Sequence, residues 1–283
     1  MDIDSVLTGS DTAFHYTKMS TALEHILHSG KLRVSQRTST NDPFEWPFSY
    51  IPIGATLADR TMIETIRRRM PEAYELIFNA VNKNTWFVSF CNNKAIRTAD
   101  SRPPDPREGY GFLKPRMWSQ YGEGSKGVCL AFSKNALVEI AERSFPLQRP
   151  YSGDVDYVHF KDFELGELHV NAAALANTEP EPFANWFLET FNRQICFRKH
   201  VDYKDEQEFR LAICTTAEMT PTAEMDITPA LQAIIVNYSK AEPYMKLLCE
   251  HATHYKVKLF EINWENQKIE VANVDCHRPP GST

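Results

Sequence analysis

Two pairs of residues have the types and the spacing to bind and act on a small ligand. His15 and Thr17 alternate along the run FHYT, and Glu206 and Glu208 stand two apart in YKDEQEFRLAIC. Because side chains alternate along a strand, His15 and Thr17 would share one face and present two hydrogen-bonding groups. If the strand of the second run reaches back to Glu206, the two carboxylates lie about 6.5–7 Å apart and can address neighbouring points of one ligand.

Both pairs also have a purely structural interpretation. A single histidine in a strand is more often a structural residue whose hydrogen bonds are satisfied. In EFRLAIC, the residues Phe209, Leu211 and Ile213 should face a core, while Glu208 and Arg210 share the opposite face. An exposed Glu–Arg pair contributes little stability by itself. The spacing alone leaves the ligand-binding and the structural interpretations open.

Short strands mixed with helices would have to position these residues. Strands are predicted over 14–17, 31–35, 85–91, 127–132, 155–160, 208–214, 233–238 and 257–264, and helices over 21–29, 60–81 with a break at Pro71, 134–143, 182–199 and 242–254. No strand is followed by a glycine-rich phosphate loop, and the elements have no regular strand–helix–strand rhythm. This pattern predicts an α+β fold, with a split mixed or antiparallel sheet and helices packed on it.

The organisation expected along the chain is one α+β domain over residues 1–276. Residues 92–116 are rich in proline and charge and predict a long loop insertion, while residues 277–283 predict a disordered tail. A solvated insertion and a loop that contacts a target are both open interpretations of residues 92–116. No internal repeat is visible.

Composition excludes several classes of protein. Of the 283 residues, 42% are hydrophobic and 24% are charged, as in ordinary globular proteins, and the net charge of −6 argues against a surface coated throughout for nucleic acid. The first ten residues predict no secretory signal, and no apolar run is long enough for a transmembrane helix. The six cysteines form no CxxC pair, and four lie in apolar runs. We therefore expect a cytoplasmic protein with reduced cysteines, no bound metal and no membrane partner.

Two further stretches could contribute to a site. In STNDPFEWPF, the sequence Asn41-Asp42-Pro43 is a strong turn signal that anchors a loop. In MWSQYGEGSKGVCLAF, Trp118 and Tyr121 stand three residues apart on what would be one helical turn. Aromatic pairs with this spacing are usually part of a core, and they can also form a wall for a flat ring.

The ordered set of motifs HYT, ILHSGKL, NDPFE, MWSQYG with KGVCLAF, and DEQEFRL resembles a bacterial and phage family catalogued as domain of unknown function twenty-nine seventy-one. The similarity runs from about Phe14 to Ile213 and continues more weakly to the end. The chain departs from the family pattern at Gln120, where the family usually has histidine, and in the insertion at 92–116.

A looser similarity supplies an expected activity. A strand with H-x-T, a helix that ends ILxxGxL and a late strand with a glutamate are similar to the ADP-ribosyltransferase fold. This similarity implies NAD as a substrate and a macromolecular acceptor, either protein or nucleic acid, as for a toxin or phage-defence effector. By this similarity, His15 would bind a ribose hydroxyl of NAD with support from Thr17, and Glu208 would be the catalytic carboxylate with Glu206 as its upstream partner. Further NAD-binding residues would be Asn41, Trp118 and Tyr121.

The expected chemistry suits these residue types. Cleavage between nicotinamide and ribose builds positive charge on the sugar, and a fixed carboxylate stabilises that charge more in the transition state than in the ground state. Two other functions stay open: a metal-dependent nuclease that uses His15, Asp42, Glu45 and Glu208, and a non-catalytic sensor or interaction module. The acceptor and the oligomeric state are not determined by the sequence.

Overall fold

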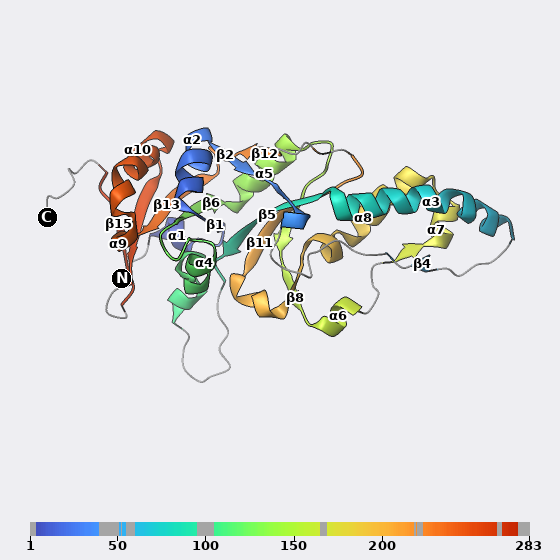
Figure 1. Cartoon of the computed structure of the whole chain (residues 1–283), viewed down its shortest axis with the longest axis horizontal. Coiled ribbons are helices and arrows are strands. Elements are labelled where there is room, and N and C mark those ends of the chain that lie inside the picture. The colour runs from blue at the N-terminus through green and yellow to red at the C-terminus, as the bar shows by residue number, and fades with distance from the viewer. Residues whose placement is uncertain are drawn as a thin grey trace.

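A nine-stranded mixed sheet forms the centre of the molecule among the residues that the structure describes (Figure 1). The described residues are 4–39, 51, 53–54, 60–94, 105–164, 169–217, 219, 223–264 and 268–276. The structure is a computed structural model. The strand order is β15 (Glu270–Asn273), β14 (Lys258–Asn263), β13 (Leu231–Asn237), β6 (Val128–Ser133), β1 (Thr12–Thr17), β5 (Thr85–Asn92), β11 (Glu208–Cys214) and β7 (Tyr151–Asp154), with β3 (Ser35–Gln36) paired to β5. Only β13 and β14 run parallel among these pairs, and the other pairs are antiparallel.

Three two-stranded pairs accompany the large sheet: β2 (Lys31–Arg33) with β12 (Glu224–Asp226), β8 (Asp156–Val158) with β10 (Arg198–His200), and β4 (Ile53–Gly54) with β9 (Val170–Asn171). The α-helices are α1 (Ser5–Thr8), α2 (Leu27–Ser29), α3 (Arg60–Lys83), α4 (Pro115–Gln120), α5 (Lys134–Ser144), α6 (Phe160–Glu164), α7 (Ala172–Ala176), α8 (Pro180–Cys196), α9 (Tyr238–Ala241) and α10 (Met245–Tyr255). Shorter helical segments are the π-helical η1 (Thr21–Ile26) and the 3-10 turns η2 (Arg37–Ser39), η4 (Pro106–Gly109), η5 (Gly111–Leu113), η6 (Val201–Glu206) and η7 (Glu242–Tyr244).

Helices cover both faces of the sheet because each strand buries apolar side chains on alternate sides. One face packs on η1, α5 and α10, through residues such as Leu130 and Ile234. The other face packs on α1 and α4 near β1 and on α3 and α8 near β11. Figure 1 shows α3, α7 and α8 gathered at one end of the molecule and α10 with β15 at the other. The α+β class with a mixed sheet and packed helices is therefore confirmed.

The sheet opens between two of its inner strands, β1 and β5. Strand β1 pairs with β6 at six positions, but it pairs with β5 only at Ala13↔Asn92 and Phe14↔Cys91. Strand β5 remains paired with β11 at seven positions. Beyond Phe14, β1 therefore follows one half of the sheet and β5 follows the other, which leaves room between them for a ligand.

The predicted strand and helix positions are largely confirmed, with instructive exceptions. Gly30 ends α2 with φ of 69°, the left-handed conformation that glycine adopts most easily. Pro71 does not break α3, which continues without interruption from Arg60 to Lys83. Helix α8 ends at Cys196, so the predicted helix over 182–199 extends too far, and Lys199 lies in strand β10.

The predicted insertion at 92–116 is only partly a loop. Residues 95–104 lie outside the described residues. Residues 105–116 form η4, η5 and the start of α4, and Phe112 and Leu113 are buried against β1 in the same cluster as Phe14. The sequence misled here because proline and charge dominate the composition, whereas one short apolar run, GFL, decides the packing. The predicted tail at 277–283 also lies outside the described residues.

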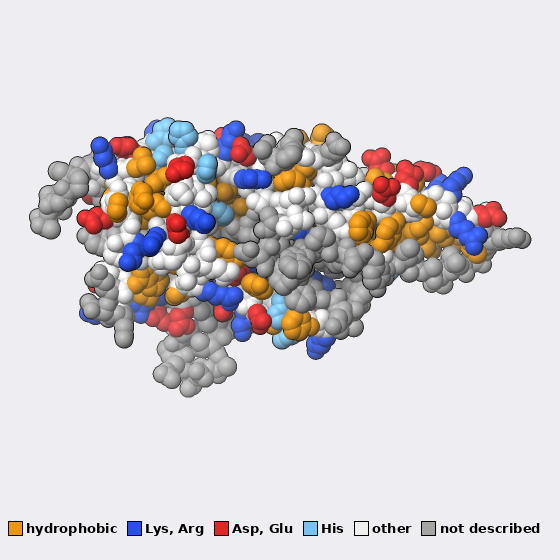
Figure 2. All heavy atoms as spheres, viewed as in Figure 1, with side chains coloured by type: hydrophobic (Ala, Val, Ile, Leu, Met, Phe, Trp, Pro, Cys, Tyr) orange, Lys and Arg blue, Asp and Glu red, His pale blue; other side chains and the backbone are white. Residues whose placement is uncertain are grey.

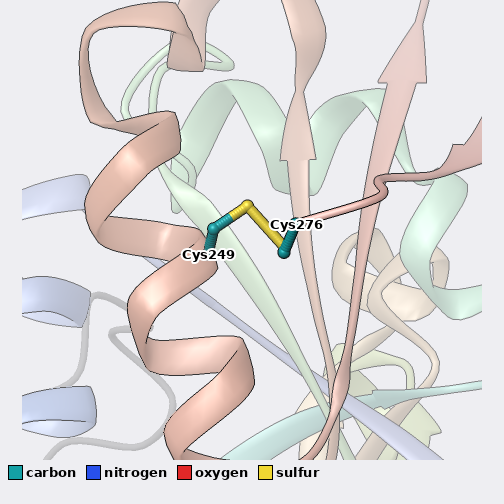
Figure 3. Close-up of a disulfide and its surroundings, with 2 residues drawn as sticks. All are labelled: Cys249 and Cys276. Atoms are coloured by element: carbon teal, nitrogen blue, oxygen red, sulfur yellow. A yellow bond between two sulfur atoms is a disulfide. The ribbon is translucent and has the colours of Figure 1, made fainter. Parts of the chain in front are cut away.

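The cysteines divide into two groups. The four in apolar runs, Cys91, Cys129, Cys196 and Cys214, are buried free thiols, as predicted. Cys249 and Cys276 form a disulfide between α10 and the segment after β15, with the two Cα atoms 5.2 Å apart (Figure 3). The expectation that every cysteine is reduced is therefore wrong for this pair, which the wide spacing of 27 residues conceals in the sequence.

Charged side chains of both signs are visible on one face of the molecule (Figure 2). On the face shown in Figure 2, the Lys and Arg side chains are interspersed with Asp and Glu side chains, as expected for a net charge of −6. Within the described residues, no helix combines the length and the apolar character that crossing a membrane requires.

Candidate functional site

A cavity of about 720 Å³ lies where β1 and β5 separate. Its lining comes from β1 and β5, from η1, α2 and β2, and from the side chains of Tyr121, Lys199, Glu206 and Glu208. The volume falls within the range of about 300–1,000 Å³ that is usual for small-molecule and cofactor sites. The opening of the sheet therefore produces a ligand-sized cavity beside most of the predicted site residues.

His15 stands at the point where the strands diverge. Its Nδ1 lies 3.0 Å from the carbonyl oxygen of Ser89 in β5, so this nitrogen must carry the proton and donate it. Burial lowers the pKa of His15, and the Ser89 carbonyl only partly opposes that effect. The imidazole is therefore neutral at pH 7, and its Nε2 is left as a hydrogen-bond acceptor. Such a group can accept a hydrogen bond from a hydroxyl.

Glu206 and Glu208 come together without sharing one strand. Strand β11 starts at Glu208, whereas Glu206 is the last residue of η6. Gln207 between them has φ of 46°, a left-handed conformation that turns the chain. The strand therefore does not reach back to Glu206, yet both carboxylates line the cavity.

A buried network of charges holds the two carboxylates. Lys199 Nζ lies 2.6 Å from Glu206 Oε2 and 3.2 Å from Glu208 Oε2, and Arg210 Nε donates to Glu208 Oε1 at 2.6 Å. The Tyr121 hydroxyl donates to Glu206 Oε1 at 3.2 Å. Glu208 and Arg210 do share one face of β11, as predicted, but they are 3% and 1% exposed and not on a solvated surface.

The two carboxylates differ in their proton affinity. Burial opposes the charge on Glu208, but Arg210 and Lys199 outweigh it and lower the pKa of Glu208 to about 2. For Glu206, burial prevails over Lys199, so its pKa is raised above the ordinary value. Glu208 is therefore a permanent anion near neutral pH, and Glu206 is the carboxylate of the two that more readily takes a proton.

The two aromatic candidates separate. Tyr121 lines the cavity, and burial raises its pKa, so its hydroxyl stays protonated. Trp118 is 1% exposed, its indole NH donates to the Phe112 carbonyl at 2.8 Å, and its ring packs edge-on against Tyr16. The structure thus places Trp118 in the core, where it cannot contact a ligand in the cavity without repacking.

Other predicted residues lie elsewhere. Thr17 is buried at the end of β1 opposite Val128, and the cavity lining does not include it. Asn41, Asp42 and Glu45 lie outside the described residues. Within the ranges that the structure does describe, no group of three or more His, Cys, Asp and Glu side chains is placed to hold a metal ion.

Three residues that contribute to the site were not predicted from the sequence. Lys199 was assigned to a helix but lies in strand β10. The Tyr157 hydroxyl accepts a hydrogen bond from the Glu208 backbone NH at 2.8 Å, and Ser89 supplies the carbonyl for His15. Neither role leaves a signal in sequence spacing, because the partners are more than 50 residues apart.

Fold and site together define an α+β protein with a ligand cavity in an opened sheet. Residues 117–211 match the model of a family described as Protein of unknown function (DUF2971). The match confirms the family resemblance over the second half of the predicted range and includes Tyr121, Lys199, Glu206 and Glu208, but not His15. No curated protein and no solved structure matches the chain.

Proposed function

We propose that this protein is an ADP-ribosyltransferase-like enzyme that uses NAD to modify a macromolecule, in the manner of a toxin or phage-defence effector. The observation that carries the proposal is the cavity at the sheet opening, with neutral His15 between the strands and permanently ionised Glu208 in its wall. The cavity is large enough for a nucleotide-sized ligand, and its groups match the needs of a reaction that develops positive charge.

The proposed reaction is a substitution at the ribose carbon C1′. The bond between C1′ and the nicotinamide nitrogen breaks, and the bonding electrons leave with nicotinamide. A nucleophile of the acceptor forms the new bond to C1′ and loses its proton. Glu208 would stabilise the positively charged sugar of the transition state, a contribution on the order of 10²–10³ in rate by analogy with other preorganised groups.

The remaining groups have roles that follow from their protonation. His15, with Nε2 as an acceptor, would accept a hydrogen bond from a ribose hydroxyl of NAD. Glu206, whose pKa is raised, would take the proton that the acceptor loses. Tyr121 would pack against the nicotinamide ring at the cavity wall.

A second candidate function, a ligand-sensing module without catalysis, is favoured by one observation. Both oxygens of Glu208 lie within 3.2 Å of a cation, Arg210 on one side and Lys199 on the other. In such a module, the network would hold the cavity wall together and NAD or another ligand would bind without being cleaved.

The test is release of nicotinamide and incorporation of labelled ADP-ribose from NAD in a cell lysate. The parent protein is compared with Glu208→Asp, which keeps the charge but moves the carboxylate back, and with Glu139→Gln, an exposed glutamate on α5. The proposal expects label in the parent and in Glu139→Gln, and at least about a tenfold loss in Glu208→Asp.

Protease and nuclease treatment of the labelled product then identifies the acceptor class. If folded parent protein neither releases nicotinamide nor incorporates label, the transferase proposal is wrong. Stabilisation of the same protein by NAD in a thermal melt would then support the sensing module.

A further inference from the structure

The Lys199 side chain occupies the centre of the buried charge network. It projects from β10, is 7% exposed, and places its ammonium group within 3.2 Å of both Glu206 and Glu208. The same ammonium group lies 4.9 Å from the centre of the Tyr203 ring. Two carboxylates and an aromatic face therefore hold this lysine in one position.

Charge balance explains why the buried network needs Lys199. Two carboxylates in one buried site disfavour each other's ionised form unless cations compensate. Arg210 is committed to Glu208, and its guanidinium also donates to the Cys196 carbonyl at 2.6 Å. Among the ion pairs of the described residues, Lys199 is the cation that contacts Glu206. Neutralisation of the second carboxylate therefore depends on Lys199.

We propose that Lys199 is a positioning residue of this site, whose ammonium group holds Glu206 beside Glu208 and lets both carry negative charge in a buried position. The importance of Lys199 to catalysis rests on the proposed function, because that function needs Glu208 as an anion and Glu206 as a proton acceptor. The charge-balancing role itself does not depend on which ligand the cavity takes.

The groups that face Glu206 determine in which direction its pKa should change when the Lys199 charge is removed. Besides Lys199, these are the carboxylate Glu208 and the protonated groups of Tyr121, Tyr157 and Cys91. Lys199 and the Tyr121 hydroxyl favour the ionised form of Glu206, whereas burial and Glu208 oppose it. Removal of the lysine charge should therefore raise the pKa of Glu206 further, by about 1–3 pH units as for other adjacent opposite charges.

The first test follows the titration of the Glu206 carboxyl carbon by NMR in protein with labelled glutamate. In Lys199→Met the midpoint should move to higher pH by about 1–3 units, and in Lys199→Arg, which keeps the charge, it should stay near that of the parent. The matched control is Lys134→Met, because Lys134 also lies over an aromatic ring, Phe209, but its ammonium group donates to the Asn92 side-chain oxygen and not to a carboxylate. An unchanged Glu206 midpoint in Lys199→Met overturns the proposal.

A stability cycle decides the question if Lys199→Met folds poorly. Adding Glu206→Gln removes the carboxylate that the lysine balances, so the double variant should unfold at a higher urea concentration than Lys199→Met alone. A double variant that is equally or less stable contradicts the charge-balancing role. The urea midpoints need no ligand and no activity.

The activity arm separates the two proposals. If the parent transfers ADP-ribose, the low-pH limb of its pH–rate profile reports the carboxylate that must be ionised, and Lys199→Met should move that limb to higher pH. If the parent has no such activity, the proposed function fails, while the Glu206 titration still decides the role of Lys199.

Discussion

Replacing Glu208 by glutamine tests the buried charge network directly. The change keeps the shape of the side chain and removes its charge, so Arg210 and Lys199 lose a buried partner at 2.6 and 3.2 Å. The drop in the pKa of Glu208 from the ordinary 4.5 to about 2 corresponds to about 3 kcal/mol at 1.36 kcal/mol per pH unit. Breaking a buried ion pair from one side typically costs about 3–5 kcal/mol. We therefore expect Glu208→Gln to lose about 3 kcal/mol of unfolding free energy at pH 7.

The pH dependence gives the same prediction a second, independent readout. Because folding lowers the pKa of Glu208, its contribution is complete above about pH 4.5 and disappears as the pH falls toward 2. The difference in unfolding free energy between the parent and Glu208→Gln should therefore shrink over this range.

Urea denaturation at a series of pH values measures both effects. Glu139→Gln, which removes an exposed glutamate from α5, should change the unfolding free energy by no more than about 0.5 kcal/mol. A Glu208→Gln variant as stable as the parent at pH 7, or a stability difference that is the same at pH 6 and pH 3, would refute the argument.

Three further outcomes are expected. His15→Ala should weaken NAD binding about fivefold to tenfold in isothermal titration calorimetry, because one hydrogen bond is lost, and equal affinities would remove the assigned role. Tyr121→Phe should lower the unfolding free energy by about 1–2 kcal/mol and raise the pKa of Glu206, as the lost hydroxyl favours the ionised carboxylate. Cys276→Ser should lower the free energy of unfolding by about 2–4 kcal/mol relative to the oxidised parent, because the disulfide with Cys249 closes a long loop. Parent protein in reductant should have the same stability as the variant. A variant as stable as the oxidised parent would contradict this prediction.

Alternation along the chain predicted the strands of the site well. Phe14 and Tyr16 pack on one side of β1, and Phe209 and Leu211 face the opposite core from β11, as period-two patterns require. These positions were predictable because the two faces of a strand meet different environments, and each environment returns at every second residue.

The parts that the sequence did not predict depend on exceptions to such repeats. Gln207 adopts a left-handed conformation without being glycine, so Glu206 leaves the strand although the alternating pattern continues through it. Lys199 was assigned to a helix because the preceding helical pattern has no stop signal, yet tertiary pairing of β10 with β8 ends the helix at Cys196. Trp118 looked available to a ligand because spacing says nothing about depth, and only the contacts to Phe112 and Tyr16 show that it is core.

The order of strands around the opening also has a consequence for dissecting the protein. The stretch 117–211 that matches the family contains β6 and the first four residues of β11, whereas β1 and β5, which lie between them in the sheet, come from earlier in the chain. Excised alone, that stretch would leave β6 without both of its neighbours, β1 and β13, and β11 without β5, and exposed strand edges of this kind promote self-association. The smallest fragment that could hold the cavity must therefore reach back at least to Thr12.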